Sequence, residues 1–355
     1  MALQSFKATD FRCLAEAELE PDSGFNLVYG DNASGKTSLL EAIAYLGRGR
    51  SFRGAATQNL IRHGAREFVL FGKIVQEERG FGLGAKNGPG GLEVSADGEH
   101  GGGAAVLARR LPLQIIDPEI HSLVAGGPEE RRRYLDWIVF HVEPNYVDDW
   151  RRFRRALKQR NAALKSGATT VELESWDQEF AELGVRVHEA RERVFEVALP
   201  CLVDFAEGLL QRRIGFEYRR GWVNDVSLGE ALAAGRVRDQ QLRSTQSGPH
   251  RADLRLIYDD RQARRLVSRG QQKLLSCALI LAATEIAQSE LDQPLLLLLD
   301  DPAAELDSGS LARLMERVVA LGCQVIATAL EPQAALFPQP PAMFHVEQGV
   351  LKRVG

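Results

Sequence analysis

The sequence is poor in cysteine, and the few cysteines it has are scattered. Its 355 residues include only four of them: Cys13, Cys201, Cys277 and Cys323. None forms a Cys-x-x-Cys pair or a metal-ligand spacing. This pattern argues against a disulfide-stapled secreted domain and against a thiolate metal site. It is typical of reduced thiols in a cytosolic protein.

Segments that direct a chain to a membrane are also missing. The N-terminal stretch MALQSFKATDFRCL lacks the apolar core of a signal peptide. The leucine run Leu295–Leu299 is far shorter than the roughly 20 apolar residues of a membrane-spanning helix. We therefore expect a cytoplasmic protein with no membrane partner.

An excess of positive charge is absent as well. Against 44 Lys and Arg stand 48 Asp and Glu, so the net charge is −4. Any binding of nucleic acid must therefore come from a local patch. The length suits about two domains with a sizeable core, and no internal repeat is visible.

A glycine-rich stretch carries the strongest functional signal. GDNASGKT fits G-x-x-x-x-G-K-[ST], between the apolar run Phe25–Tyr29 and a helical pattern that Gly47 would end. In such a loop, backbone N–H groups cradle phosphates at a helix N-terminus. Lys36 would reach the β- and γ-phosphates of ATP, and the Thr37 hydroxyl would bind Mg²⁺. The predicted loop contacts to ATP are Gly30, Asp31, Asn32, Ala33, Ser34, Gly35, Lys36, Thr37 and Ser38.

A pair of carboxylates follows the leucine run. Leu295–Leu299 has the continuous apolar character of a parallel strand buried on both faces, and Asp300 and Asp301 end it. Such folds bind ligands at the carboxyl ends of their strands. We expect Asp300 to hold Mg²⁺, and Asp301 to orient or deprotonate the attacking water. Alternatively, both only cap a turn before Pro302.

A helical segment separates the two parts of this site, because Asp300 lies 263 positions after Thr37. From Pro128 to about Arg213 the pattern is helical, and apolar residues from Trp176 to Cys201 follow a heptad. The break at residues 166–170 predicts an antiparallel helical arm. Alternatively, both helices pack onto the core.

Two hairpins are also expected. One lies in the glycine-rich residues 80–103, with its turn at Asn87 and Gly88. The other is ADLRLIYDDRQARRLV, with its turn at Asp259 and Asp260.

Three further positions gain meaning beside the phosphate loop. Ser268 begins the helix SRGQQKLL, Gln114 lies in LQIID after a short strand, and Thr328 ends the strand CQVIATAL. Read alone, they are an N-cap serine, a surface glutamine and a strand-end threonine. With the loop and the later Glu305–Asp307, they resemble three parts of ABC-type ATPases. These are the signature motif, the glutamine that senses Mg²⁺ and water, and the γ-phosphate switch.

Over essentially its whole length the chain resembles the RecF family of bacterial recombination and repair proteins. The motifs that carry the resemblance are DFRCL at Asp10, GDNASGKTSLLEAI, GRGRSFR at Gly47, LPLQIIDPE at Leu111, GGPEERRRYLDW at Gly126, LKQRNAAL at Leu157, SGPHRADL at Ser247, SRGQQKLL and LLDDPAAELD. The resemblance implies an α/β fold: a P-loop ABC-type ATPase head, similar to Rad50 and SMC heads, split by a short helical arm. The implied domains are 1–118 and 241–355 for the head and 119–240 for the arm.

The resemblance also implies an activity and partners. It implies slow ATP hydrolysis, an ATP-dependent homodimer, binding to gapped DNA or single-/double-strand junctions, and recombinase loading with RecO and RecR during DNA repair. The implied catalytic residues are Lys36, Gln114 and Asp301, with Mg²⁺ at Thr37, Asp300 and Gln114. Further implied nucleotide contacts are Arg12, Ser268, Gly270, Gln271 and Thr328.

Two basic clusters are candidates for DNA contact. The first has no acid within it and comprises Arg151, Arg152, Arg154, Arg155, Lys158, Arg160 and Lys165. The second comprises Arg48, Arg50 and Arg53, which alternatively serve the nucleotide or the dimer face. A basic helix face is also commonly just solvated. Two other functions stay open: the nucleotide-binding subunit of an ABC transporter, and a scaffold that ATP locks without a need for turnover.

Overall fold

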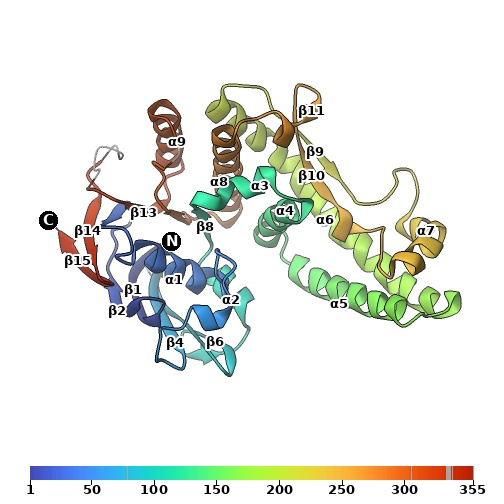
Figure 1. The fold of residues 1–355 in the computed structure, drawn as a ribbon, viewed down its shortest axis with the longest axis horizontal. Coiled ribbons are helices and arrows are strands. Elements are labelled where there is room, and N and C mark those ends of the chain that lie inside the picture. Colours follow the sequence, from blue (N-terminus) through green and yellow to red (C-terminus); the bar gives the residue numbers. More distant parts are fainter. Residues whose placement is uncertain (78, 305, 333–336, 338, 355) are drawn as a thin grey trace. The chain divides into compact units, whose positions relative to one another are not determined.

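The computed structural model describes residues 1–77, 79–304, 306–332, 337 and 339–354, in two compact units (Figure 1). Unit 1 combines Met1–Ile120 with Cys277–Gly355, and unit 2 is His121–Ser276. The mixed α/β class is confirmed, with a largely helical unit inserted between the two parts of a sheet-rich one. The predicted arm ended at residue 240, whereas unit 2 runs to Ser276, because strand β10 (Asp253–Tyr258) pairs with β9 (Gly215–Arg219).

Unit 1 contains two six-stranded sheets. The first is antiparallel, in the order β2-β1-β4-β5-β6-β7. Its strands are β1 (Ala2–Phe11), β2 (Leu14–Leu19), β4 (Phe68–Gln76), β5 (Arg79–Gly88), β6 (Gly91–Ala96) and β7 (Glu99–His100). The second has the order β15-β14-β3-β13-β12-β8 and is parallel except at β15. Its strands are β3 (Phe25–Tyr29), β8 (Leu113–Ile116), β12 (Leu296–Leu299), β13 (Gln324–Ala329), β14 (Ala342–Glu347) and β15 (Val350–Val354).

Helix α1 (Lys36–Arg48) joins the two sheets into one core (Figure 1). Its apolar residues pack with Phe6 and Phe68 of the first sheet and with Leu298 and Ile326 of the second. The other helices of unit 1 are α2 (Ala104–Arg110), α9 (Ser308–Ala320) and the larger part of α8 (Arg269–Leu291). Burial on all sides of α1 fixes the phosphate loop that precedes it.

Two local predictions in unit 1 were wrong by two residues. Helix α1 continues through Gly47, where a side chain would collide with Leu113, and ends at Gly49, whose φ of 65° suits glycine. The first hairpin turns at residues 89–90, because Asn87 pairs with Leu92 inside the ladder. The buried side chain of Asn87 donates to the Tyr45 hydroxyl at 2.5 Å.

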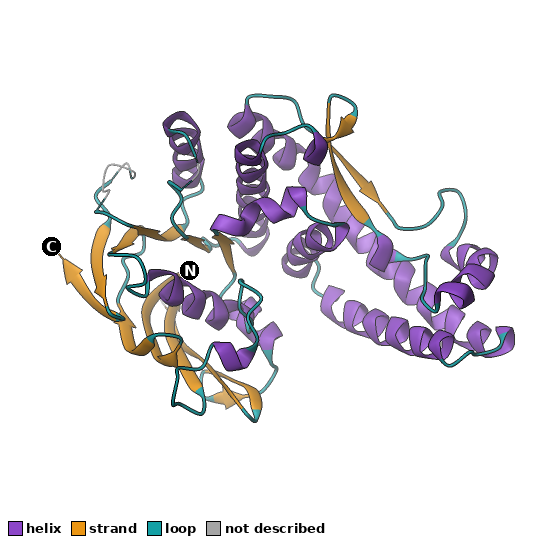
Figure 2. Ribbon diagram, viewed as in Figure 1, coloured by secondary structure: helices purple, strands orange, loops and turns teal. Residues whose placement is uncertain are grey.

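Unit 2 is mainly helical (Figure 2). Its helices are α3 (Ser122–Ala125), α4 (Pro128–Val142), α5 (Tyr146–Lys165), α6 (Thr170–Leu210) and α7 (Leu228–Leu242). Its sheet has the order β11-β10-β9, with β11 at Arg261–Gln262. The predicted hairpin turn at Asp259 and Asp260 is confirmed, and both residues have positive φ.

The predicted helical hairpin is confirmed as α5 and α6, which pack together across a short connection. A capping box at Thr169 and Glu172 begins α6. The buried seam follows the heptad from Phe180 to Val194 and then changes. Val197 is 78% exposed, and Ala198 takes the buried position. The change in register turns the C-terminal part of α6 toward other neighbours, which include β9.

Helix α8 is long and apolar enough to cross a membrane by length and composition alone. However, 67% of its apolar window is buried within the protein. The core helix of a soluble protein has the same character.

Arg160 does not belong to an exposed basic face, contrary to the sequence interpretation. Its side chain is fully buried and donates to Asp177 at 2.7 Å, to Asp239 at 2.7 Å and to Thr245 at 2.8 Å. These bonds tie α5 to α6 and to α7. The remaining basic residues of the run are exposed.

We predict that Arg160→Met lowers the free energy of unfolding of unit 2 by about 3 to 5 kcal/mol, because it leaves the buried Asp239 carboxylate without a cation, whereas Asp177 keeps its pair with Arg236. All four tryptophans, at 137, 150, 176 and 222, lie in unit 2, so urea unfolding followed by their fluorescence reports on this unit alone. The control is Arg155→Met on the exposed face of α5, expected to change stability by less than about 0.5 kcal/mol. Equal losses in the two variants would contradict the structural role of Arg160.

Candidate nucleotide-binding site

The phosphate loop of unit 1 is shaped by close backbone contacts. A side chain at Gly30 would collide with the carbonyl oxygen of Val346, and Gly35 has a φ of 116° directly before α1. The N–H of Gly349 donates to the Ser34 carbonyl at 2.8 Å, so the β14–β15 turn supports the loop. The Ser34 hydroxyl is buried and has no partner among the described residues. An unpaired polar group beside the unpaired N–H groups of a helix start fits an anion such as phosphate.

Lys36 lies at the start of α1 and folds back over the loop. Its Nζ donates to the carbonyls of Gly30 at 2.6 Å and Asp31 at 2.8 Å. Partial burial lowers the pKa of this ammonium, while the carboxylates of Asp301, Asp300 and Asp31 oppose that shift. The cation is thus held among neutral carbonyls, which a phosphate oxygen would replace as a stronger acceptor.

Asp300 is the convergence point of the site. It lies at the end of β12, is 6% exposed, and accepts through Oδ1 from Thr37 at 3.1 Å and from Thr328 at 2.8 Å. Burial raises the pKa of Asp300, the two hydroxyls lower it, the Asp301 charge raises it and Arg53 lowers it. The structure therefore brings together Thr37 and Asp300, which the sequence separates by 263 positions.

The oxygens of Thr37 and Asp300 suit Mg²⁺, which prefers hard oxygen ligands. Among the described residues, no group of three or more His, Cys, Asp or Glu is arranged to hold a metal. The two side chains would therefore share the ion with phosphate oxygens and water.

Asp301 and Thr328 are joined by a further bond. The Asp301 N–H donates to the Thr328 hydroxyl at 3.0 Å, and Asp301 has a φ of 48°. The Thr328 side chain is fully buried, so its hydroxyl positions both aspartates from the neighbouring strand β13. Thr328 was predicted to act as a γ-phosphate switch. The structure adds that its hydroxyl bonds to both aspartates.

Gln114 does not follow a strand but lies within β8, contrary to the sequence interpretation. It pairs in register with Leu297 and is 3% exposed. Its Oε1 accepts from Arg48 at 2.9 Å. Two more strand residues separate it from the sheet edge where Asp300 lies, since the Asp300 N–H donates to the Ile116 carbonyl.

Asp117 occupies the edge position after β8, and the sequence interpretation missed it. Burial raises the pKa of Asp117 to about 6; the N–H of Glu119 opposes the shift and Asp300 adds to it. Its Oδ1 is buried with no hydrogen-bond partner in the described part of the chain. The sequence signal was the acid directly after the strand LQII, the same signal that identified Asp300.

Arg12 and Ser38 lie beside the loop. Arg12 donates to both carboxylate oxygens of Glu41 at 2.9 Å, and Glu41 itself is completely buried. The Ser38 hydroxyl accepts from the exposed Cys13 thiol at 3.4 Å. The pair with Glu41 therefore fixes the Arg12 side chain against α1.

The remaining predicted residues belong to unit 2. Ser268 directly precedes α8, and Gly270 and Gln271 lie in its first turn; Ser268 and Gly270 are exposed and Gln271 is half-buried. The Gln271 N–H donates to the Ser268 hydroxyl at 3.3 Å, and the Ser268 N–H donates to the Gln271 side chain at 2.9 Å.

Of the ELD motif, Glu305 lies outside the described residues, and Asp307 caps α9 by accepting from the Ser310 N–H at 2.9 Å.

Comparisons with known proteins agree with this geometry. The family described as RecF/RecN/SMC N terminal domain matches residues 2–351. The DNA replication and repair protein RecF of Yersinia enterocolitica is 41% identical over 356 residues, covering 99% of this chain and 99% of the relative. Its namesake from Erwinia tasmaniensis is 40% identical over 353 residues, covering 98% of each.

Two solved structures are also similar. One is described as the recombination mediator protein RecF-ATP in the RecFOR pathway, with a TM-score of 0.89 and 26% identity, over 100% of this chain and 98% of that one. The other is an Smc head bound to the C-winged helix domain of ScpA, with a TM-score of 0.60 over 100% of this chain and 98% of that one. At 15% identity the second likeness concerns the fold alone.

We predict that Asp117→Asn stabilises unit 1 at neutral pH. The folded-state pKa of about 6 lies above the ordinary 3.8, so ionisation of Asp117 costs stability as pH rises through this window. The amide removes a cost of about 1 to 3 kcal/mol above pH 7, after allowance for solvent screening, and removes almost nothing below pH 4. Calorimetric melting without nucleotide at several pH values measures this difference. Asp259→Asn in the exposed β10–β11 turn is the control, and a pH-independent gain would contradict the explanation.

Proposed function

The chain belongs to the RecF family, and on that basis we propose that it is an ATP-dependent, DNA-binding protein of replication and recombinational repair. The observation that carries the proposal is the meeting of Thr37 with Asp300 at 3.1 Å, which joins the phosphate loop to a strand-end carboxylate. The names of the relatives support the pathway. In this proposal unit 1 is the ATPase head and unit 2 is the arm, both acting in the cytoplasm.

The residues of unit 1 divide the work of hydrolysis. The loop N–H groups and the Ser34 hydroxyl bind the phosphates, and Lys36 exchanges its carbonyl partners for phosphate oxygens. Thr37 and Asp300 hold Mg²⁺, which when bound neutralises charge on the β- and γ-phosphates. Asp301 accepts a proton from the attacking water, with its backbone fixed by Thr328 at 3.0 Å. Asp301 replaces the longer glutamate of transporter ATPases, which fits slow turnover.

The exposed first turn of α8 suits a role across a dimer. The Ser268 hydroxyl accepts from Gln271, so its own proton is available to a phosphate of the second subunit. A side chain at Gly270 would meet nothing within 4 Å, so the turn is open for close approach. We propose that two heads close on two ATP molecules, with Ser268 of one subunit facing Lys36 of the other. Tighter ATP binding to the closed state is what shifts the equilibrium.

DNA is held in this proposal by the exposed face of α5. Arg155 and Lys158 lie one turn apart on that face, with Arg151, whose guanidinium is 3.7 Å from Asp148. The closed dimer would hold gapped DNA or a single-/double-strand junction and act with RecO and RecR to load recombinase. The family membership gives no support to a transporter subunit. An ATP-locked scaffold remains the alternative, and full repair function in an Asp301→Asn protein that does not hydrolyse ATP would favour it.

We predict that Lys36→Ala weakens ATP binding roughly 100-fold, because it removes two charge-assisted hydrogen bonds to phosphate of about 1.5 to 3 kcal/mol each before compensation. Isothermal titration with ATP measures the loss. Lys352→Ala, at an exposed position of β15, is the control and keeps the affinity of the original protein. Near-normal affinity in Lys36→Ala would remove the phosphate-loop assignment.

We predict that Ser268→Arg keeps the ATP affinity of each monomer but abolishes the ATP-induced dimer and most hydrolysis, because a bulky side chain blocks closure. Sedimentation and phosphate release measure both effects. Ser227→Arg is a matched control, since Ser227 is also an exposed N-cap with a capping box and its replacement costs only about 1 kcal/mol of stability.

A mixture of Ser268→Arg with Lys36→Ala provides a further test. It restores one intact composite site per dimer and should recover part of the ATPase activity. A Ser268→Arg protein that dimerises and hydrolyses normally would refute the two-head arrangement.

A further inference from the structure

One face of the small sheet in unit 2 carries a line of arginines that the proposed site does not use. In the register of β9 and β10, Arg219 lies opposite Asp253, and Glu217 lies opposite Arg255. Gln262 of β11 continues the same face, because it pairs with Ile257, two residues beyond Arg255. The sheet thus presents one polar surface along its length.

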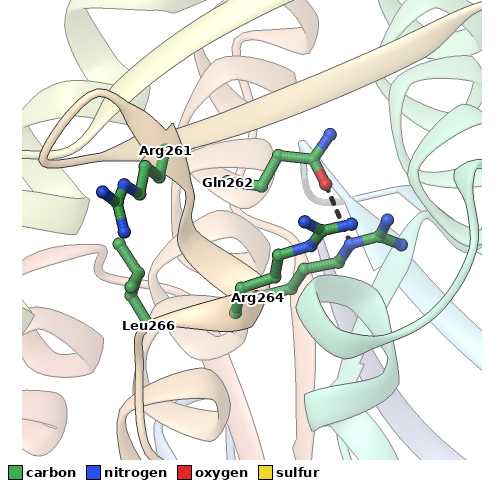
Figure 3. A pocket seen from close by; sticks show the side chains of 5 residues that line it. Arg261, Gln262, Arg264 and Leu266 are labelled. Carbon is green, nitrogen blue, oxygen red and sulfur yellow. Dashed lines mark hydrogen bonds between the residues drawn. The ribbon is translucent and has the colours of Figure 1, made fainter.

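Three neighbouring hollows form a groove over this face. The first, of about 610 Å³, is bordered by Arg219, Arg220, Trp222, Arg251 and Arg255 among others. It shares Asp253 and Arg255 with the second, which has a volume of only about 10 Å³ and is the narrow middle of the groove. The second shares Gln262 and Arg264 with the third, of about 680 Å³. Figure 3 shows the third hollow, where Arg264 extends to Gln262 and donates to it at 3.0 Å. Six residues of β10 alone span roughly 20 Å at about 3.3 Å each, so the groove is long enough for an extended ligand.

The charge of the groove is strongly positive. We call Arg219, Arg220, Arg251, Arg255 and Arg264 the arginine track. Three of them bond to neutral groups: Arg220 to the carbonyls of Val223 and Val226, Arg251 to that of Thr245, and Arg264 to Gln262.

Few carboxylates oppose the arginine track. Glu217 lies 2.8 Å from Arg219 and 4.0 Å from Arg255, so the two arginines share one charge. Asp253 is already paired with the buried Arg131 at 2.8 Å. The five guanidinium groups therefore face a single remaining carboxylate in the described part of this surface.

Several donors along the groove also lack acceptors. The Nε–H of Arg220, the Nε–H of Arg255 and the indole N–H of Trp222 are buried and have no partner among the described residues. Buried donors without acceptors cost free energy, so rotations of these side chains that present the N–H groups to acceptors on a ligand are favoured. The guanidinium of Arg220 also lies 4.7 Å from the centre of the Trp222 ring.

We propose that the arginine track binds the phosphate backbone of a DNA strand, with Trp222 as a contact for a base at one end. This inference rests on the proposed DNA-binding function and adds a second DNA contact to the exposed face of α5. Phosphate oxygens supply the anionic acceptors that guanidinium groups and orphaned N–H groups require. The length of the groove and the aromatic ring at its end favour a nucleic acid over a small anion. Arg264 lies four residues before Ser268, so a bound strand reaches the helix that is proposed to meet ATP.

The test removes three charges from the arginine track with Arg219→Gln, Arg255→Gln and Arg264→Gln in one protein. The matched control removes three exposed charges elsewhere in unit 2 with Arg193→Gln, Arg213→Gln and Arg238→Gln. Fluorescence anisotropy with a labelled single strand, a duplex and a gapped duplex is measured over a range of salt concentrations. We expect about tenfold or greater weakening in the track variant and little change in the control. The slope of log K against log salt should fall by about 2 to 3, for three lost phosphate contacts.

Each outcome has a distinct meaning. Absence of DNA binding in the original protein overturns the proposed function itself. Intact DNA binding in the track variant overturns this inference alone and leaves the groove to an acidic protein partner. Equal weakening in the track variant and the control assigns the effect to net charge and also overturns this inference. Loss of DNA binding that occurs only when Arg151, Arg155 and Lys158 are replaced by Gln overturns it as well. Unchanged ATP affinity and circular dichroism verify that the track variant is folded.

A second measurement addresses Trp222 without removing charge. Trp222→Phe keeps an aromatic face, so its affinity for a single strand should stay within about threefold, whereas Trp222→Ala should lose about 1 to 3 kcal/mol of stacking, equivalent to roughly 5- to 150-fold. The quenching of tryptophan fluorescence on addition of a single strand should be smaller in Trp222→Phe. Identical quenching in the original protein and in Trp222→Phe would refute the contact between Trp222 and a base.

Discussion

The nucleotide site depends on keeping one carboxylate charged in a place where water barely reaches it. Asp300 is buried at a strand end, and burial alone would favour its neutral form. Two hydroxyls, from Thr37 on α1 and Thr328 on β13, offset part of this upward pKa shift by donating to the same oxygen. The carboxylate thereby ties the phosphate loop to two neighbouring strands. This polar junction must form together with the apolar core around α1, since neither half of the unit contains all of its members.

Unit 2 uses buried arginines to fix how its elements pack. Three buried guanidinium groups each bind an aspartate on another element: Arg131 with Asp253, Arg160 with Asp239 and Arg191 with Asp136. Such pairs add little net stability compared with apolar packing, but they specify geometry, because a misaligned pair leaves a charge unsolvated. They fix α4 against β10, α5 against α7, and α6 against α4. The arginine track lies outside these buried pairs, and its guanidinium groups lie at the groove where a ligand can reach them.

The parts of this molecule that were predictable from sequence are those where chemistry is local. The phosphate loop needs fixed residues at fixed spacing, and the leucine strand with its terminal aspartates has a similarly compact pattern. Gln114 and Arg160 were misplaced because burial is decided by partners far away in the chain: Arg48 for the glutamine, and Asp177 and Asp239 for the arginine. Asp117 was overlooked although it follows its strand just as Asp300 does, because one acid after a four-residue strand that itself contains the polar Gln114 is a weak signal. The end of α1 depended on which of two nearby glycines takes a positive φ, and this is Gly49, with a φ of 65°.

The divided layout of unit 1 also has a consequence for how the protein is made. In the second sheet, β3 is flanked by β14 and β13, and β8 by β12, so these two early strands have only late-synthesised neighbours. During translation the edges of β3 and β8 stay unpaired until their partner strands, which begin at residue 296, leave the ribosome. The inserted unit is one continuous stretch and completes its own contacts first. Unit 2 therefore becomes a folded body while the second sheet of unit 1, whose first strands are made earlier, is still incomplete and in need of protection from aggregation.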